Sequence, residues 1–168
     1  GVAATLPRYR SGGVARQLSA WLLDWAARQG WHGVNVNAVT SHPFTQHIGV
    51  RLNFRPCGLL LGLAPASLSF HGIADQLRQR ESCVLAYHAL QPPSARALYP
   101  PLRYQPLLAR IYDWLDRPAS FAPGQAPTAM TSRWETTAKG HLGTAIITLR
   151  QLGQDAAHIV AGQLLDLR

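Results

Sequence analysis

Residues 10–15, Arg-Ser-Gly-Gly-Val-Ala, join an extended segment to a long helical one, and this junction limits the folds open to the chain. The stretch 1–6 (GVAATL) is typical of the end of a strand. From Gly13 to about Gln29 apolar residues recur at helical spacing, and Gly30 suits the position just after a helix. The apolar stripe consists of Val14, Leu18, Trp21, Leu22 and Trp25. We expect this stripe, with its two tryptophans, to pack in the core of an α/β protein.

The same junction has the features of a phosphate-binding turn. The first turn of a helix carries N–H groups without acceptors and the positive end of the helix dipole, and both stabilise an anion. Small residues at Gly12, Gly13 and Ala15 let the backbone approach the anion closely. Three arginines add positive charge around the turn: Arg8, Arg10 and Arg16. The spacing is neither that of a Walker A loop nor that of the three-glycine dinucleotide fingerprint.

The rest of the chain alternates strand-like and helix-like segments. Strands are expected at 34–39, 57–63, 82–90, 133–138 and 144–149, and helices at 44–52, 106–115 and 155–167. The expected organisation is a core at 1–90, a Pro-rich crossing and helix at 91–116, a linker at 117–131, and a hairpin plus helix at 132–168. This predicts an α/β fold with a mixed sheet flanked by helices. The last segment would complete that sheet or begin a second similar unit.

The run PRYRSGGVARQLSAWLLDWAARQG resembles motif A of the GNAT superfamily of N-acetyltransferases. The family pattern is Gln/Arg-x-x-Gly-x-Gly/Ala, and Arg10, Gly13 and Ala15 stand at its three defined positions. VNVNAVTSHPF resembles the family's next strand and turn. TQHIGVRLNFRPCGLLLG resembles the following short helix and strand, with Leu52-Asn53-Phe54 where the family has Leu-Gly-Phe. The resemblance covers about residues 1–90 and implies a GNAT-like, acyl-CoA-binding core.

The resemblance also implies a cosubstrate site. Acetyl-CoA, or another acyl-CoA, would lie in a V-shaped opening between the strand that ends near Thr5 and the strand at 34–39. Backbone N–H groups of the turn would hold the pyrophosphate, and a backbone group near Ala4 or Thr5 would contact the pantetheine arm or the thioester carbonyl. An amine of an unknown acceptor would attack the thioester. The implied cofactor-binding residues are Ala4, Thr5, Arg10, Ser11, Gly12, Gly13, Val14, Ala15 and Arg16.

Two residues are candidates for acid–base chemistry. Many family members carry a tyrosine acid in the short helix, but Gly49 stands at that position here. His42, just after the predicted cofactor strand, could act as a general base, or it could cap the turn. Tyr87, on the strand at 82–90, could replace the missing acid, or it could be an ordinary strand aromatic. The alternative function is therefore a GNAT-like regulatory or interaction module without chemistry.

Charge and composition narrow the range of partners. The formal net charge is +8, and Lys139 is the only lysine among 16 basic residues, so nearly all of this charge is arginine, which suits phosphate contacts. A basic chain of this kind favours an anionic partner such as a nucleotide cofactor. The arginines are scattered and no nucleic-acid reader module is visible, which disfavours nucleic acid. A second copy of the chain, or another segment, could complete the sheet.

Other patterns argue against metal and membrane association. The spacing of His32, His42 and His47 does not fit a zinc site, so no metal is expected. No apolar run reaches the roughly 20 residues needed to span a bilayer. Cys57 and Cys83 lie outside any CxxC pattern and are expected to be reduced thiols. Together these features predict a cytoplasmic bacterial protein.

Overall fold

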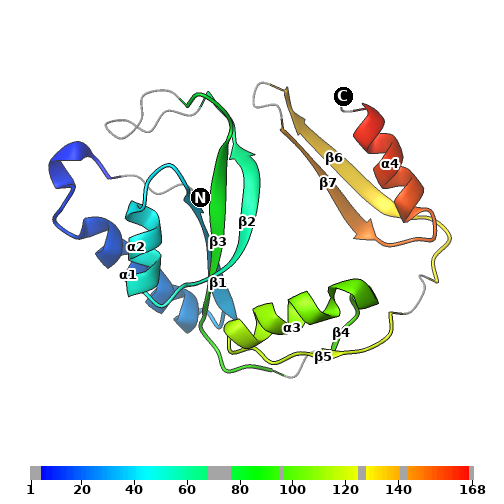
Figure 1. The fold of residues 1–168 in the computed structure, drawn as a ribbon, viewed down its shortest axis with the longest axis horizontal. Helices are drawn as coiled ribbons and strands as arrows, with labels where there is room; N and C mark the ends of the chain where they lie inside the picture. Colours follow the sequence, from blue (N-terminus) through cyan, green and yellow to red (C-terminus); the bar gives the residue numbers. More distant parts are fainter. Residues whose placement is uncertain (1–4, 68–76, 95–96, 125–127, 141–143, 167–168) are drawn as a thin grey trace. The chain divides into compact units, whose positions relative to one another are not determined.

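The computed structural model describes residues 5–67, 77–94, 97–124, 128–140 and 144–166 (Figure 1). Helices and strands alternate along the chain, which makes the protein α/β as predicted. The chain divides into two compact units. Unit 1 comprises Gly1–Leu98 and Leu102–Phe121, and unit 2 comprises Tyr99–Pro101 and Ala122–Arg168.

Unit 1 follows the order of elements expected from the sequence. Its main elements are α1 (Val14–Arg28), β1 (Gly33–Val39), α2 (Phe44–Arg51), β2 (Arg55–Ala64), β3 (Glu81–Ala89) and α3 (Gln105–Trp114). Two short 3₁₀ helices, η1 (Pro7–Tyr9) and η2 (Leu102–Tyr104), precede α1 and α3. Two short strands pair in parallel, β4 (Ala97–Leu98) with β5 (Ser120–Phe121), and the sequence contained no signal for them.

The main sheet of unit 1 has the order β1-β3-β2, and both pairings are antiparallel. Irregularities interrupt the pairing of β2 with β3 between Pro56 and Gly58 and between Leu60 and Ala64, close to the glycines of β2. A parallel neighbour of β1 was predicted at 1–6. Residues 1–4, including Ala4, lie outside the described residues, and residues 5 and 6 are not in a strand. The mixed character of the sheet therefore stays a prediction.

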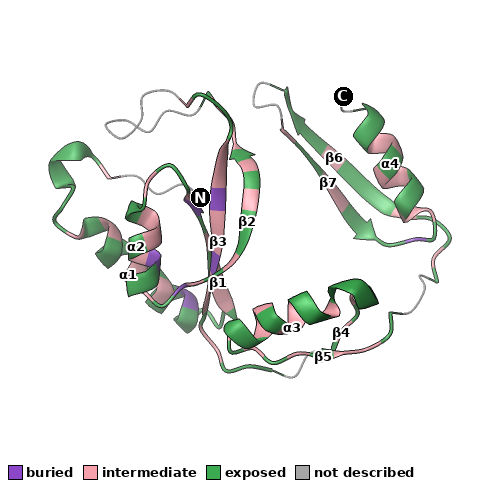
Figure 2. Ribbon diagram, viewed as in Figure 1, coloured by how far each residue is buried: buried purple, intermediate pink, exposed green. Residues whose placement is uncertain are grey.

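The core of unit 1 is built mainly from small side chains (Figure 2). α1 and α2 contact β1, and the buried apolar residues are Ala26, Ala38, Phe54, Cys83 and Ala86. Small residues bring a helix close to a sheet, because little side-chain volume separates the two backbones. The backbone of α1 thus approaches the sheet through alanine rather than through its large residues.

The apolar stripe of α1 does not form the core, so this prediction was wrong. Its residues remain exposed, including Trp21 at 55% and Trp25 at 37%. Trp25 meets the ring of Trp31 edge-on, with centroids 5.4 Å apart. Ala26 is the residue of α1 that is buried, and the large residues of the stripe lie on exposed sides of the helix.

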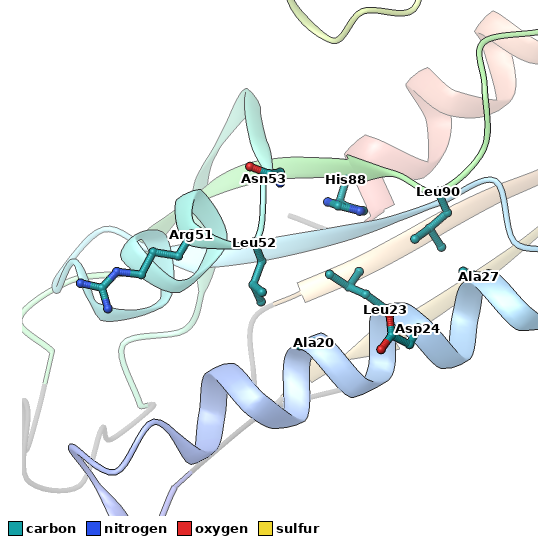
Figure 3. A pocket seen from close by; sticks show the side chains of 9 residues that line it. All are labelled: Ala20, Leu23, Asp24, Ala27, Arg51, Leu52, Asn53, His88 and Leu90. Carbon is teal, nitrogen blue, oxygen red and sulfur yellow. The ribbon is translucent and has the colours of Figure 1, made fainter.

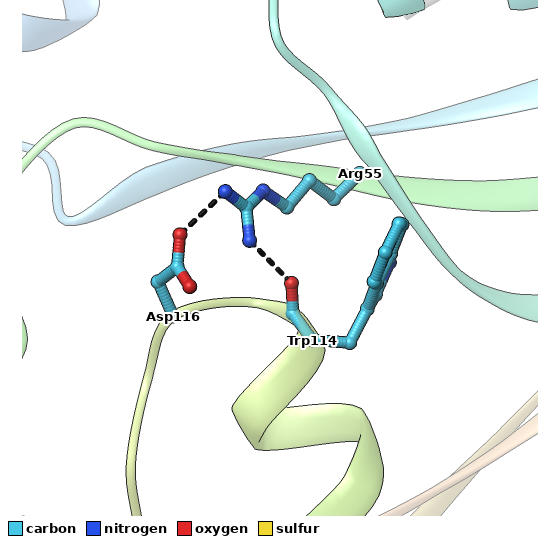
Figure 4. Close-up of polar contacts among 3 residues, drawn as sticks. All are labelled: Arg55, Trp114 and Asp116. Atoms are coloured by element: carbon cyan, nitrogen blue, oxygen red, sulfur yellow. Dashed lines mark hydrogen bonds and ion pairs between the residues drawn. The ribbon is translucent and has the colours of Figure 1, made fainter.

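α3 is tied to β2 by one arginine and one tryptophan (Figure 4). The guanidinium of Arg55 donates to the carbonyl of Trp114 at 2.5 Å and forms an ion pair with Asp116. In return, the indole Nε1 of Trp114 donates to the carbonyl of Pro56 at 2.9 Å. Because the Arg55–Asp116 pair is largely exposed, the bonds to backbone carbonyls contribute most of the link.

Replacing Arg55 with alanine should lower the free energy of unfolding of unit 1 by about 1–2 kcal/mol, because a charged donor to a carbonyl is lost. Chemical denaturation with Trp114 fluorescence as one readout would measure this change. Asp116→Asn is the matched control, since it removes only the exposed ion pair, and it should cost at most about 0.5 kcal/mol. Equal losses of unfolding free energy in both variants would contradict the conclusion that the bonds to backbone carbonyls contribute most of the link between α3 and β2.

Unit 2 contains the hairpin and the final helix that the sequence predicted. β6 (Arg133–Lys139) pairs antiparallel with β7 (Thr144–Gln151), and α4 spans Ala156–Asp166. The Thr136 hydroxyl donates to Gln163 Oε1 at 2.8 Å, which joins α4 to the hairpin. Within the described ranges, no helix of either unit combines the length and apolar character that crossing a membrane requires.

Candidate functional site

The backbone between η1 and α1 takes left-handed conformations at two positions. Ser11 has φ 66° and Gly13 has φ 73°, while Gly12 between them is outside the positive-φ region. A positive φ is rare for serine, so its backbone here is held in an uncommon conformation. Alternation of this kind turns successive N–H groups toward one side and forms a concave site for an anion. The chain turns here with left-handed backbone at Ser11 and Gly13, and the anion site stays a prediction.

The start of α1 leaves N–H groups available. Gly13 is the N-cap and makes no side-chain capping bond. The N–H of Gln17 donates to the carbonyl of Gly13 at 3.0 Å, so the N–H groups of Val14, Ala15 and Arg16 precede the helical ladder. The first turn carries no acidic residue that would offset the positive end of the dipole. An anion placed at this end would be stabilised.

Arginines lie beside the turn and contact the segment before it. Arg10 Nε donates to the carbonyl of Thr5 at 3.2 Å, which links the predicted end of the first strand to the turn. The Arg8 guanidinium lies over the ring of Tyr9 at 4.9 Å. Arg10, Ser11 and Gly12 are exposed, so a ligand can reach them from solvent.

The two candidates for acid–base chemistry lie in different places. His42 is half-buried between β1 and α2, with its ring 5.3 Å from that of Phe44. The Tyr87 hydroxyl donates to the carbonyl of His32 at 3.3 Å, in the connection that follows the last turn of α1. The 15 residues of α1 span about 22 Å, and the turn precedes the first of them. The structure therefore does not bring Tyr87 to the turn.

The end of α2 accommodates the two departures from the family pattern. Gly49 is buried, and a Cβ there would lie 3.6 Å from Cβ of Phe54, which is ordinary contact. Asn53 has φ 59°, a left-handed conformation that asparagine tolerates better than most residues. The N–H of Phe54 donates to the carbonyl of Gly49 at 2.8 Å and closes the helix. Asn53 can therefore occupy this position with a left-handed backbone.

The two thiols are poorly suited to nucleophilic chemistry. Cys83 is buried and Cys57 is half-buried, and both are free. Desolvation raises the pKa of both thiols, and the nearby Glu81 carboxylate raises that of Cys83 further. Little reactive thiolate therefore forms at neutral pH. In the part of the chain that the structure describes, no group of three His, Cys, Asp or Glu residues could hold a metal ion.

A cavity of about 280 Å³ lies beside α1, at a distance from the turn (Figure 3). Its lining comes from α1, from the end of α2 with the connection to β2, and from the end of β3. The residues are Ala20, Leu23, Asp24, Ala27, Arg51, Leu52, Asn53, His88 and Leu90. Sequence reasoning missed this cavity, because the lining residues are remote in sequence and share no motif.

No protein-family model matches the chain, and no curated protein sequence matches it. Among solved structures, it is similar to that of smu.2055 from Streptococcus mutans UA159, with a TM-score of 0.37 and 15% identity. The match covers 51% of this chain and 47% of that one, so the chain spans about half the length of this neighbour.

Proposed function

We propose that unit 1 binds acyl-CoA at the turn formed by Arg10–Ala15 and transfers the acyl group to an amine. The observation that carries this proposal is the left-handed backbone of Ser11 and Gly13 at the uncapped N-terminus of α1. These features orient N–H groups toward one anion, as binding of a pyrophosphate requires.

Two further observations support CoA as the source of that pyrophosphate. The order α1, β1, α2, β2 is the one that the resemblance to motif A and to the segments after it implies. Arg8, Arg10 and Arg16 surround the turn, and the chain carries a net charge of +8, which favours a polyanionic cosubstrate. Arg10 also donates a hydrogen bond to the Thr5 carbonyl and holds it near the turn. The pantetheine arm would begin on this side of the turn.

The proposed reaction is direct transfer. The amine nitrogen bonds to the acyl carbon, the carbon–sulfur bond breaks, and CoA leaves as a thiolate that then takes up a proton. A general base accepts the proton released by the amine. His42 is the candidate for this role, because it follows the end of β1 on the chain and histidine is the side chain that most often serves as a general base.

The first test measures the affinity of CoA for Arg10→Ala by isothermal titration. Loss of a charged hydrogen bond should weaken binding about tenfold. Arg28→Ala is the matched control, since it removes the same charge from the other end of α1 and should leave the affinity unchanged. A folded wild-type chain that does not bind CoA at about 1 mM would overturn the proposal.

A second candidate function is a CoA-binding regulatory or interaction module without transfer. Two observations favour it: Gly49 stands in place of the family's acid, and the hydroxyl of Tyr87 is bonded to His32. Loss of the acetyl-CoA thioester, followed with a thiol reagent across a panel of amines, separates the two functions. Transfer predicts amine-dependent release of CoA, and the module predicts binding without release.

A further inference from the structure

The carboxylate of Glu81 bonds to the chain just beyond the end of β1. Glu81 is the first residue of β3, and β1 ends at Val39, which pairs with Cys83. Oε1 of Glu81 accepts a hydrogen bond from the Thr40 hydroxyl at 2.5 Å and another from the N–H of Ser41 at 2.7 Å. One carboxylate oxygen of β3 therefore fixes the two consecutive residues that follow β1.

Residues 40–43, the connection from β1 to α2, are also held from the helix side (Figure 1). Nε2 of Gln46 in α2 donates to the carbonyl of Val39 at 3.0 Å, and the N–H of His47 donates to the carbonyl of Pro43 at 2.8 Å. These bonds fix both ends of the connection, while Glu81 fixes its middle.

His42 is the next residue after the pair that Glu81 fixes. Its ring is half-buried and lies 5.3 Å from that of Phe44, the first residue of α2. Hydrogen bonds to a carboxylate are shorter and stronger than those between neutral groups. A side chain that takes part in chemistry depends on such supporting bonds for its place. The bonds to Glu81 therefore decide where the backbone of His42 lies, and with it the imidazole ring.

The loss of these bonds should affect geometry more than stability. Thr40 and Ser41 are exposed, so water can bond to their donor groups once the carboxylate is removed. The rest of β3 keeps its pairing with β1, including the bond from the N–H of Thr40 to the carbonyl of Ser82 at 3.0 Å. A reacting group that moves by about 1 Å can lose about a hundredfold in rate, even when the fold is intact.

We propose that Glu81 is a positioning residue for His42: its carboxylate oxygen holds residues 40 and 41 and so sets where the imidazole lies beyond the end of β1. The inference rests on the proposed transfer reaction, in which His42 is the candidate base. Glu81 acts through two hydrogen bonds that it accepts, so an uncharged acceptor of the same length should replace it.

The first test follows transfer from acetyl-CoA to an amine in variants of the complete chain. Glu81→Ala should lower kcat by at least about tenfold and leave the KM for acetyl-CoA within about twofold. Glu81→Gln keeps the accepting oxygen and should retain kcat within about threefold. Ser82→Ala is the matched control, because the Ser82 hydroxyl accepts from the N–H of Gly62 in β2 at 3.1 Å and its loss leaves the connection untouched.

A double-mutant cycle separates positioning of His42 from a general loss of structure. In a chain that already carries His42→Gln, Glu81→Ala should lower kcat no further, because the group that it positions is gone. An equal fall in kcat in both backgrounds would overturn the proposal. A kcat for Glu81→Gln as low as that for Glu81→Ala would also overturn it, since the charge and not the accepting oxygen would then matter.

The second test does not depend on transfer. NMR resonances of the His42 ring, assigned from His42→Gln, should shift in Glu81→Ala and stay near their wild-type positions in Glu81→Gln and Ser82→Ala. If Glu81→Ala fails to fold, Thr40→Val removes one of the two donors and should shift the same resonances. A wild-type chain without transfer would overturn the proposed function alone. Ring resonances that stay unchanged in Glu81→Ala or Thr40→Val would overturn the role of Glu81.

Discussion

Replacing Gly13 with valine is expected to weaken CoA binding by about five- to thirtyfold. Gly13 has φ 73° and begins α1, so its conformation decides where the N–H groups of the turn point. A left-handed conformation costs an L-residue about 1–2 kcal/mol, and a β-branched residue adopts it least readily. The turn would give up this conformation, and the proposed pyrophosphate site would be lost. Isothermal titration with CoA measures the effect.

Gly30→Val provides the matched control for this experiment. Gly30 has φ 74° and follows the other end of α1, with no atom within 4 Å of an added Cβ. Both variants therefore introduce similar backbone strain into the same helix and should lose similar stability. Only the Gly13 variant should lose CoA affinity. If the two variants bind CoA equally well, the turn is not the pyrophosphate site.

The second large effect is expected at Gly33, where alanine should lower the free energy of unfolding of unit 1 by about 2–3 kcal/mol. An added Cβ would lie 2.0 Å from the hydroxyl oxygen of Tyr87 and 2.3 Å from its Cζ. Overpacking of this kind forces side chains from their rotamers and shifts the backbone. The hydrogen bond from Tyr87 to His32 would break as well. Chemical denaturation measures the loss.

A double-mutant cycle identifies the cause of that loss. Tyr87→Ala removes the ring that an alanine at Gly33 would strike, so the double variant should recover at least about 1 kcal/mol relative to additivity. Gly58→Ala in β2 is the control, because its Cβ would meet only Leu85 at 3.6 Å. Additive losses at Gly33 and Tyr87 would show that the ring can move away without cost.

Local signals in the sequence were sufficient for most of the elements. The helical spacing from Gly13 to Gln29 predicted α1, which spans Val14–Arg28. The strand at 34–39 and the short helix ending at Leu52-Asn53-Phe54 correspond to β1 and α2. These helices and this strand depend on contacts between residues close in sequence, so the spacing of apolar residues is enough to predict them. The two-residue strands β4 and β5 were missed, because so short a pairing has no periodicity to detect.

The sequence by itself determined the turn: glycine at position 13 tolerates the left-handed backbone, and the helical spacing after it sets the start of α1. Only the tertiary structure decided which side of α1 packs on the sheet, and it left Trp21 exposed. The tertiary structure also brought the Tyr87 hydroxyl within hydrogen-bond distance of the His32 carbonyl and placed His88 in the wall of a cavity. A sequence pattern shows that residues share one face of an element, but what that face contacts depends on the shapes of segments remote in sequence.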